Sequence, residues 1–340
     1  MMRRTRQNKT KSAAPALIAS ILLVLAIGGG LLCLHFWDKK PDNADLPRTE
    51  NGNDEIPGQI SVVYQGEEYR LRDELDCFLI IGLDKFTTTT SNPEFFLNNQ
   101  QADFLLLMIV DKDSSSYCAL HLNRDTMAEI QRLGLGGKKL DLFYGQLALA
   151  HTYGSGGKDS CRNTVDAVSR FLYGVPIDHY LSLTMDAIPV LNDLAGGVTV
   201  HVGDDFSAVD PSLEQGKDVH LMGQQALTYI RARGSMNEPT NLNRMARQRE
   251  YINALYKQLS QKMRESDGFG RRMATQMADY SVSDLTTSEL SRFAEQFKDY
   301  SFLGIYTVPG EAVLGERFME YYADDDALQE LVIRLFFKKA

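Results

Sequence analysis

Cysteine and histidine are scarce in this chain of 340 residues, which has four of the first and six of the second, and neither recurs at a metal-ligand spacing. Three cysteines lie outside the apolar N-terminal run, an odd number that argues against a dense disulfide framework, and we interpret them as buried small side chains. No Gly-x-Ser-x-Gly hydrolase signature occurs. The glycine-rich stretch 154–160 lacks the Walker spacing, so it predicts a loop before a helix rather than a nucleotide site.

Positive charge is also lacking over most of the chain. The formal net charge is −9, and the first 11 residues hold five cations and no acid, which leaves 31 cations against 45 acids in the remainder. A body with this excess of acid does not bind nucleic acid through a diffuse basic surface, so no nucleic-acid partner is expected. A cluster of arginines within it therefore predicts a local site.

Charged residues are absent from Ala13–Trp37, a run of mostly Leu, Ile, Val, Ala and Gly that is long enough to cross a bilayer core of about 30 Å. The run predicts a transmembrane helix at 13–37. A cleaved signal peptide is the alternative, but its apolar core is shorter, about 7–15 residues, and no small-residue cleavage signal follows here. Residues 1–12 then form a cytoplasmic tail of a single-pass cell-membrane protein. The polar, proline-containing residues 38–58 predict a linker to an extracytoplasmic domain at 59–340.

Short apolar runs alternate with helical periodicity after the linker. The runs predict buried strands at 77–83, 104–110, 117–122, 179–183, 198–202 and 302–308. Helical spacing predicts helices around 165–172 and 188–194, and at 224–233, 242–263, 288–297 and 326–337. This order predicts one α/β domain with a sheet between helical layers.

Acids flank the first two predicted strands. Asp84 follows the first strand and Asp103 begins the second, so antiparallel neighbours would bring both carboxylates to one sheet edge. Two carboxylates suit a hard cation such as Mg²⁺, with water and substrate phosphate completing its shell; solvated strand-end acids are the alternative. Arg124 and Asp125 follow the third strand and would join this edge if that strand is antiparallel to the second, or they form a structural salt bridge or a helix start.

Four arginines crowd into 17 residues. They are Arg231, Arg233, Arg244 and Arg247. The first two fall in the last turn of a predicted helix, and the other two share a face with Gln248 near the start of the next, which Thr240 or Asn241 would cap. One guanidinium group can donate to two phosphate oxygens at once, and the N-terminus of a helix favours a bound anion. The nearest acid in sequence is Glu238, so the cluster predicts a phosphate site rather than surface arginines paired with acids.

A series of sequence blocks in fixed order gives a resemblance to a known family. The blocks are G-L-D at 82–84, A-D-F-L-L-L at 102–107, H-L-N-R-D-T at 121–126, A-G-G-V at 195–198, Y-I-R-A-R at 229–233 and N-R-M-A-R-Q-R at 243–249. Together with the single N-terminal span, they resemble the LytR-CpsA-Psr family over a core of about residues 76–263. The resemblance implies a three-layer α-β-α sandwich with a central mixed β-sheet, preceded by one transmembrane helix.

The resemblance also implies an activity. Proteins of this kind are similar in moving a glycopolymer, such as wall teichoic acid or capsular polysaccharide, from a polyprenyl pyrophosphate carrier to peptidoglycan, where a phosphodiester joins it to muramic acid. The implied partners are the polyprenyl-pyrophosphate-linked glycan, peptidoglycan and the lipid bilayer. Attack of a hydroxyl on a pyrophosphate needs charge stabilisation and positioning more than a covalent nucleophile.

Roles for individual residues follow from the same resemblance. Asp84 and Asp103 would hold Mg²⁺, and Asp103, Arg124 and Asp125 would be catalytic, the base being Asp125 or a metal-side carboxylate. Pyrophosphate binding would fall to Arg124, Arg231, Arg233, Arg244, Arg247 and Gln248. An apolar channel for the prenyl tail has as candidate lining residues Val165, Val168, Phe171 and Leu172, with ordinary core packing as the alternative.

Two positions depart from the family pattern. Gln101 stands where an arginine is usual and Asn241 where an acid is usual, while Lys85 beside Asp84 adds a cation that would compensate in part. Three functions therefore stay open: the Mg²⁺-dependent transferase, a non-catalytic sensor or attenuator that binds polyprenyl pyrophosphate lipids, and a pyrophosphatase of those lipids. Gln101 favours the second. Members were once labelled transcriptional attenuators, yet the short cytoplasmic tail has no DNA-reading element.

Overall fold

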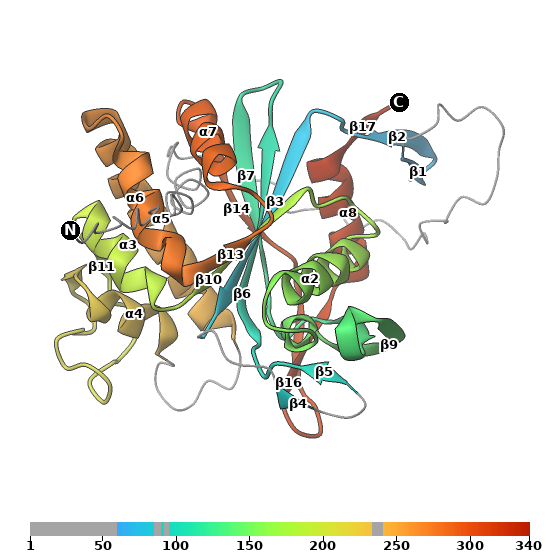
Figure 1. Cartoon of the computed structure of the whole chain (residues 1–340), viewed down its shortest axis with the longest axis horizontal. Helices are drawn as coiled ribbons and strands as arrows, with labels where there is room; N and C mark the ends of the chain where they lie inside the picture. The colour runs from blue at the N-terminus through green and yellow to red at the C-terminus, as the bar shows by residue number, and fades with distance from the viewer. Residues whose placement is uncertain (1–59, 85–89, 92–94, 233–240) are drawn as a thin grey trace, which may run out of the picture.

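A computed structural model of the chain describes residues 60–84, 90–91, 95–232 and 241–340. The centre of this described part is a six-stranded sheet with helices on both faces (Figure 1). Its strands, in spatial order, are β13 (Ser281–Ser283), β10 (His179–Thr184), β3 (Leu75–Leu83), β6 (Ala102–Asp111), β7 (Ser116–Leu122) and β14 (Ser301–Thr307). β10 is parallel to β3 and β14 to β7, whereas the other neighbours are antiparallel. The predicted mixed sheet is confirmed.

The central strands are buried on both faces, because they are apolar at nearly every position and successive side chains point to opposite sides. In β3, Phe78 and Ile80 enter one hydrophobic core, while Leu79 and Ile81 enter the other. All four side chains are at most 2% exposed. The sheet therefore separates two cores.

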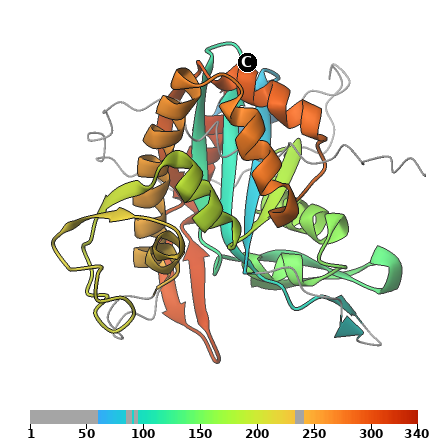
Figure 2. The ribbon, with the colours of Figure 1, turned by 60° about the vertical axis from the view of Figure 1, so that its left-hand side comes forward.

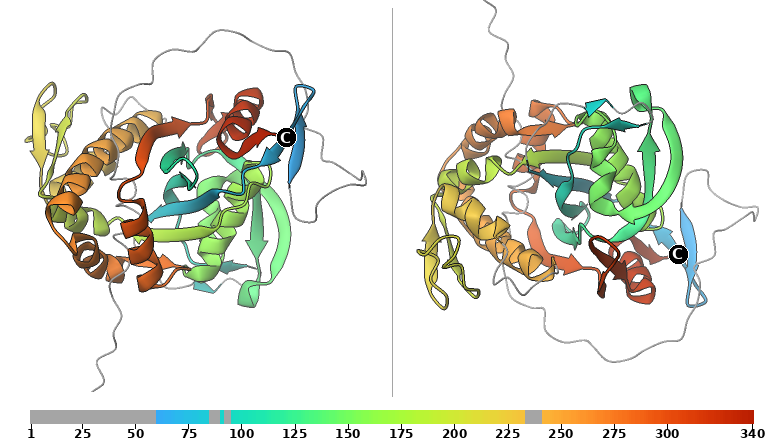
Figure 3. Two further views of the ribbon diagram at one scale, coloured as in Figure 1. Left: turned by 90° about the horizontal axis from the view of Figure 1, so that it is seen from above. Right: turned by 90° about the horizontal axis from the view of Figure 1, so that it is seen from below.

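Five helices cover one face of the sheet and two cover the other within the described residues, and the end-on views of Figure 3 show these layers. The first face carries α3 (Ala187–Ala195), α4 (Gln224–Arg231), α5 (Leu242–Glu265), α6 (Phe269–Met277) and α7 (Thr287–Phe297). The second carries α2 (Lys158–Phe171), α8 (Asp325–Phe336) and the hairpin of β8 (Met127–Leu133) and β9 (Lys139–Gln146).

Smaller elements surround this body. A three-stranded sheet joins β1 (Ser61–Tyr64), β2 (Glu67–Leu71) and β17 (Phe337–Lys339). Two-stranded pairs are β4 (Thr90–Ser91) with β5 (Phe96–Leu97), β11 (Val198–His201) with β12 (Asp218–Leu221), and β15 (Gly310–Leu314) with β16 (Met319–Ala323). The last pair is the hairpin that projects at the bottom of Figure 2. Single turns of 3-10 helix are η1 (Leu135–Gly137), η2 (Leu147–Thr152) and η3 (Ala278–Tyr280).

The predicted strands and helices are all present, within a few residues of the expected bounds. The strand predicted at 198–202 is β11, which lies outside the central sheet, in a hairpin with β12. Gly196 ends α3 at a φ of 88°, a left-handed conformation that glycine adopts without strain, and so turns the chain into β11. The C-terminal part adds β13 and β14 to the sheet; β14 is the strand predicted at 302–308, whereas β13 was not predicted.

The three cysteines outside the apolar run are buried free thiols, as predicted. Burial raises the pKa of Cys118 and Cys161 to about 12, so these thiols stay protonated and inert at neutral pH. Residues 154–157 form the expected loop before α2, and residues 158–160 begin the helix; the Gly156 amide donates to Ser160 Oγ.

Across the described residues, no helix has both the length and the apolar content needed to cross a bilayer. The predicted span 13–37 and linker 38–58 lie outside those residues, as do Lys85, Arg233 and Thr240.

Candidate functional site

The ends of three neighbouring strands carry the predicted acids and one arginine. Leu83 pairs with Ala102, and Leu105 pairs with Leu122, so the end of β3, the start of β6 and the end of β7 meet at one sheet edge. Asp84 directly follows β3, Asp103 is the second residue of β6, and Arg124 is the second residue after β7. The predicted meeting of these three residues at one edge is confirmed, and it follows from the antiparallel order of the strands.

A β-bulge sets the position of Asp103. The register shifts between Gly82 and Leu83, so that Asp103 is the extra residue opposite them on β6. Gly82 permits this close pairing, because a Cβ at this position would lie 2.7 Å from Phe104 Cβ. Bulges often redirect a side chain beside an active site.

Arg124 lies between two carboxylates. Its Nη1 forms an ion pair with Asp103, and its Nε lies 3.4 Å from Asp125 Oδ1. Nη2 donates to Gln101 Oε1 over 2.5 Å. Gln101, which stands where the family pattern has an arginine, thus gives Arg124 a neutral hydrogen-bond acceptor. The side chains of Arg124, Asp103 and Asp125 are each less than 20% exposed, so water screens their charges only in part.

Gln146 holds Asp125 from the end of β9. Gln146 is 7% exposed, and its Nε2 donates to Asp125 Oδ1 over 3.1 Å and to the Met319 carbonyl over 2.7 Å. The backbone carbonyl of Asp125 accepts a hydrogen bond from the Tyr321 amide over 2.9 Å. Sequence reasoning missed Gln146, because no motif surrounds it and only the fold brings β9 beside Asp125.

The arginine cluster divides into an exposed and a buried part. Arg231 ends α4, and its Nη2 lies 2.7 Å from Asp84 Oδ1, with both side chains about half exposed. Arg247 is only 6% exposed; its Nη1 lies 2.6 Å from Asp204 Oδ2, its Nη2 donates to the Ala232 carbonyl, and its guanidinium lies 5.1 Å from the centre of the Phe206 ring.

The expectation that the arginines of the cluster lack acidic partners is therefore wrong for Arg231 and Arg247. Their carboxylate partners come from segments distant in sequence, which the spacing around Glu238 did not reveal. Arg124 forms the salt bridge with Asp125 that was one of its two expected roles, and it also joins the edge. Arg247 in particular binds the end of α4 to the loop that follows β11, so it stabilises the segment that carries Arg231.

Arg244 lies near the end of β7. Burial lowers the pKa of His121 to about 3, and the positive charges of Arg249 and Arg244 contribute to the shift. His121 is therefore neutral at physiological pH, and its ring lies 4.8 Å from that of Phe104. Asn241 occupies the N-cap position of α5 without the predicted capping hydrogen bond, and its Nδ2 instead donates to Asn123 Oδ1 over 3.3 Å.

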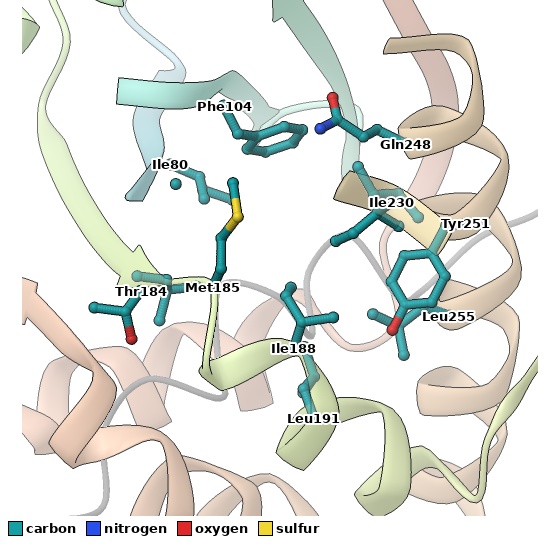
Figure 4. A pocket seen from close by; sticks show the side chains of 13 residues that line it. Ile80, Phe104, Thr184, Met185, Ile188, Leu191, Ile230, Gln248, Tyr251 and Leu255 are labelled. Carbon is teal, nitrogen blue, oxygen red and sulfur yellow. The ribbon is translucent and has the colours of Figure 1, made fainter. Parts of the chain in front are cut away.

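An apolar pocket opens beside this edge, between the sheet and α3, α4 and α5 (Figure 4). It encloses about 670 Å³, counting its open mouth. The lining residues are Ile80, Gly82, Phe104, Leu183, Thr184, Met185, Ile188, Leu191, Ile230, Gln248, Tyr251, Ile252 and Leu255. Gln248, the predicted site residue, contributes its amide to this wall. A pocket with this lining suits an apolar group.

The proposed channel residues of the 160s helix do not line this pocket. Val165, Val168 and Phe171 belong to α2 and Leu172 directly follows it. This helix covers the opposite face, where Val168 and Leu172 are fully buried in the second core. Of the two interpretations of the stripe, ordinary core packing is confirmed and the ligand channel is wrong.

The donor chemistry of the edge fits Mg²⁺. Within the described residues, no group of three or more His, Cys, Asp or Glu side chains has the geometry of a closed metal site. Mg²⁺ is, however, commonly held by one or two carboxylates together with water and substrate phosphates. Two such carboxylates are Asp84, which is half exposed, and Asp103. In this structure Asp84 forms an ion pair with Arg231, and Asp103 forms one with Arg124.

The chain therefore has a mixed α/β fold. One edge of its central sheet carries arginines and carboxylates, and an apolar pocket lies beside that edge. The LytR_cpsA_psr family matches residues 49–335. The chain belongs to this family.

Relatives and solved structures agree with that assignment. The chain is 33% identical over 183 residues to a polyisoprenyl-teichoic acid–peptidoglycan teichoic acid transferase TagU of Halalkalibacterium halodurans, covering 54% of this chain and 53% of the relative. It is 28% identical over 229 residues to the corresponding TagV of Bacillus subtilis, covering 63% and 52%. The chain thus matches about half the length of these relatives.

The fold resembles that of solved structures. The crystal structure of B. subtilis TagV has a TM-score of 0.57 at 20% identity and covers 78% of this chain and 97% of its own. TagT bound to LI-WTA has a TM-score of 0.57 at 18% identity, covering 77% and 90%. At this level of identity, the likeness concerns the fold.

Proposed function

We propose that this chain is a membrane-anchored phosphotransferase that joins a polyprenyl-pyrophosphate-linked glycopolymer, of teichoic acid or capsular type, to peptidoglycan through a phosphodiester. The observation that carries the proposal is the adjacency of a sheet edge that bears arginines and carboxylates and an apolar pocket, with Gln248 in the pocket wall. A pyrophosphate with its cation and a prenyl tail needs both environments side by side. The activity for which the relatives TagU and TagV are named supports the same reaction.

In this reaction, the acceptor hydroxyl oxygen attacks the phosphorus that carries the glycan. A new phosphorus–oxygen bond forms, the bond to the lipid phosphate breaks, and polyprenyl phosphate leaves with the electron pair. Negative charge spreads over the transferred group and the leaving phosphate. Arg124, Arg231 and Arg244 would bind these oxygens, with Arg233 as a further predicted ligand, and fixed cations stabilise such charge without reorganisation at the moment of transfer. Arg247, also predicted as a ligand from the sequence, would instead hold the end of α4 in place through Asp204 and the Ala232 carbonyl.

Asp84 and Asp103 would hold Mg²⁺, which when bound supplies charge neutralisation at the pyrophosphate oxygens. Asp125 is our candidate for the base that takes the hydroxyl proton. Gln146 donates to one of its oxygens and so fixes the direction of the carboxylate, which matters because a base must lie within hydrogen-bond reach of the proton that it removes.

The predicted span at 13–37 and linker at 38–58 would hold the domain at the outer face of the membrane that contains the lipid substrate. With the linker treated as a flexible chain of about 20 residues, its mean reach is roughly 25 Å. That distance keeps the pocket close to the bilayer.

The test is a reconstitution of the full chain with a polyprenyl-pyrophosphate-linked glycan, peptidoglycan oligomers and Mg²⁺, with products identified by mass spectrometry. The proposal expects a phosphodiester-linked conjugate and free polyprenyl phosphate. Release of lipid phosphate with no conjugate would establish a pyrophosphatase instead. Tight lipid binding with neither product would establish a sensor, the function that Gln101 favours.

A further inference from the structure

Two hairpins form one solvent-facing surface beside Asp125. Thr126, before β8, bridges to Tyr321 of β16, whose amide donates to the Asp125 carbonyl. Gln146, at the end of β9, donates to both the Asp125 carboxylate and the Met319 carbonyl. The hairpins β8–β9 and β15–β16 therefore lie side by side where they reach the site, and β8–β9 packs on the face of the sheet opposite the lipid pocket (Figures 1 and 3).

Alternation along the strands determines what this surface presents. The inward side chains, among them Ile130, Phe143 and Tyr321, are buried or pack against the second core. The outward ones form a surface that we name the acceptor face: Glu129, Leu142, Tyr144, Glu311, Glu320 and Tyr322. Tyr144 is 60% exposed and Tyr322 is 42% exposed. Gln146 lies two residues beyond Tyr144, so the face continues directly to Asp125.

In-line geometry restricts where the acceptor enters. In phosphoryl transfer, the attacking and leaving oxygens lie on opposite sides of the phosphorus. The leaving group here is the lipid phosphate, whose prenyl tail would occupy the pocket under α3 and α5. The acceptor hydroxyl must then approach from the other side of the sheet edge, which is where the acceptor face meets Asp125.

We propose that the acceptor face binds the glycan strand of the acceptor, an inference that rests on the proposed function. Sugar rings present flat C–H surfaces and N-acetyl methyl groups, which pack on exposed tyrosine rings, and hydroxyls, which donate to carboxylates. Both kinds of group are present: Tyr144 lies opposite Glu129 in the β8–β9 ladder, and the Tyr322 hydroxyl donates to Glu320 Oε2 over 2.6 Å. From Leu140 to Gln146 the strand runs for about 20 Å, enough for several sugar rings.

The charge of the face selects this occupant over two others. Glu129, Glu311 and Glu320 give it a negative potential, which repels an anionic lipid surface and the phosphate-rich donor polymer. A hydroxyl-rich, amide-rich glycan meets no such penalty. The anionic donor thus stays on the arginine side, and the two substrates are sorted by charge as well as by geometry.

The direct test is calorimetric titration of the full chain with peptide-free peptidoglycan glycan oligomers in the absence of donor lipid. A Tyr144→Ala, Tyr322→Ala double variant should bind these oligomers at least about tenfold more weakly, which is about 1.4 kcal/mol of binding free energy, because both exposed rings are lost. Leu303→Ala is the matched control, because Leu303 is 53% exposed on β14 and away from the face. Tyr144→Leu, which keeps an apolar side chain in the strand, serves if the double variant melts early.

Unchanged glycan affinity in the folded double variant, or wild-type protein that binds no glycan, would overturn the proposal. So would a double variant that keeps its glycan affinity but loses binding to vesicles of anionic lipid. The transfer assay separates this result from the proposed function. Glycan binding through the face without any transfer would support the acceptor face and reject the transferase function. Transfer with an unchanged acceptor KM in the double variant would support the transferase function and reject the acceptor face.

Discussion

Arg231 and Asp84 form an ion pair across the edge of the sheet, with 2.7 Å between Nη2 and Oδ1 and about half of each side chain exposed. Exposed pairs contribute little to stability, about 0–1 kcal/mol, because water and salt screen them. An incoming pyrophosphate and cation can therefore separate the two groups at small cost. We interpret the pair as the state of the site without substrate. When substrate binds, Arg231 would bind the pyrophosphate and Asp84 the cation.

Replacing Arg231 should affect ligand binding without affecting the fold. Arg231→Ala is expected to change the free energy of unfolding by less than about 1 kcal/mol, and to weaken binding of a polyprenyl pyrophosphate tenfold or more, because a bidentate cation is lost. Urea unfolding and lipid binding would be measured on the same preparation. Arg70→Ala is the matched control, since Arg70 is 43% exposed and pairs with Glu68 far from the site. Equal lipid affinity in the two variants would remove Arg231 from the binding site.

Arg247 should behave in the opposite way. It is almost fully buried, bonded to Asp204 and to the Ala232 carbonyl, and stacked on Phe206. Arg247→Ala leaves these partners without a cation, and breaking a buried pair costs about 3–5 kcal/mol, toward the lower end here because Asp204 is one-third exposed. Urea unfolding of the single variants and of the Arg247→Ala, Asp204→Ala double variant would measure the coupling. A fully stable Arg247→Ala protein with lost lipid binding would show that Arg247 acts as a ligand instead.

Asp103 should be required for turnover and not for folding. Asp103→Ala removes one of two predicted Mg²⁺ ligands and one of the two carboxylate partners of Arg124, which keeps Asp125. We therefore expect the transfer rate to fall by about 10²-fold or more, with a moderate fall in melting temperature that leaves the chain folded. Titration of the protein with Mg²⁺ provides a second readout. Asp113→Ala, in the exposed turn between β6 and β7, controls for loss of a carboxylate. Wild-type turnover in Asp103→Ala would exclude Asp103 from the site.

The sequence predicted the sheet edge because its three long apolar runs follow one another, and successive strands tend to be neighbours in a sheet. Only β6 and β7 are joined by a short turn, whereas residues 84–101, with β4 and β5, separate β3 from β6. Asp84, Asp103 and Arg124 could be placed together on that basis alone. The partners of the arginines could not, since Asp84 reaches Arg231, and Asp204 reaches Arg247, only through the tertiary fold. The stripe of α2 showed which side of the helix is apolar, but periodicity contains no information about which face of a sheet the helix covers. The sequence alone likewise did not show that Gln146 of β9 lies beside Asp125, because only the tertiary fold brings the two together.

Filling the pocket should weaken recognition of the lipid tail specifically. Ile188 lies on α3 in the pocket wall, and Ile188→Trp would occupy space there. Each buried methylene contributes about 0.8 kcal/mol, so affinity of the wild-type chain should rise with prenyl length. In the variant this rise should flatten, while binding of inorganic pyrophosphate stays unchanged. Leu303→Trp, on the exposed side of β14, is the control. A rise with length that is equal in all three proteins would place the tail elsewhere.

The His179–Asp284 pair should give the fold a pH-dependent stability unrelated to catalysis. The hydrogen bond to Asp284, with 3.0 Å between Nδ1 and Oδ2, raises the pKa of His179 above its usual value near 6.5, and the negative charges of Asp284, Asp178 and Asp76 act in the same direction. A raised pKa means that the folded state holds the proton more tightly than the unfolded chain does. The added stability is therefore complete below about pH 6.5 and is lost as the pH rises through the folded pKa.

His179→Gln should remove this dependence, because glutamine retains a hydrogen-bond donor but no titrating charge. We expect the wild-type melting temperature to fall between about pH 6 and 8 more steeply than that of the variant, with the two curves differing most at low pH. Thermal melts across that range would measure it. His220→Gln controls for loss of an exposed histidine, since His220 lies in the β11–β12 hairpin away from this pair. Parallel curves for wild type and His179→Gln would mean that the Asp284 contact does not hold His179 in its charged form.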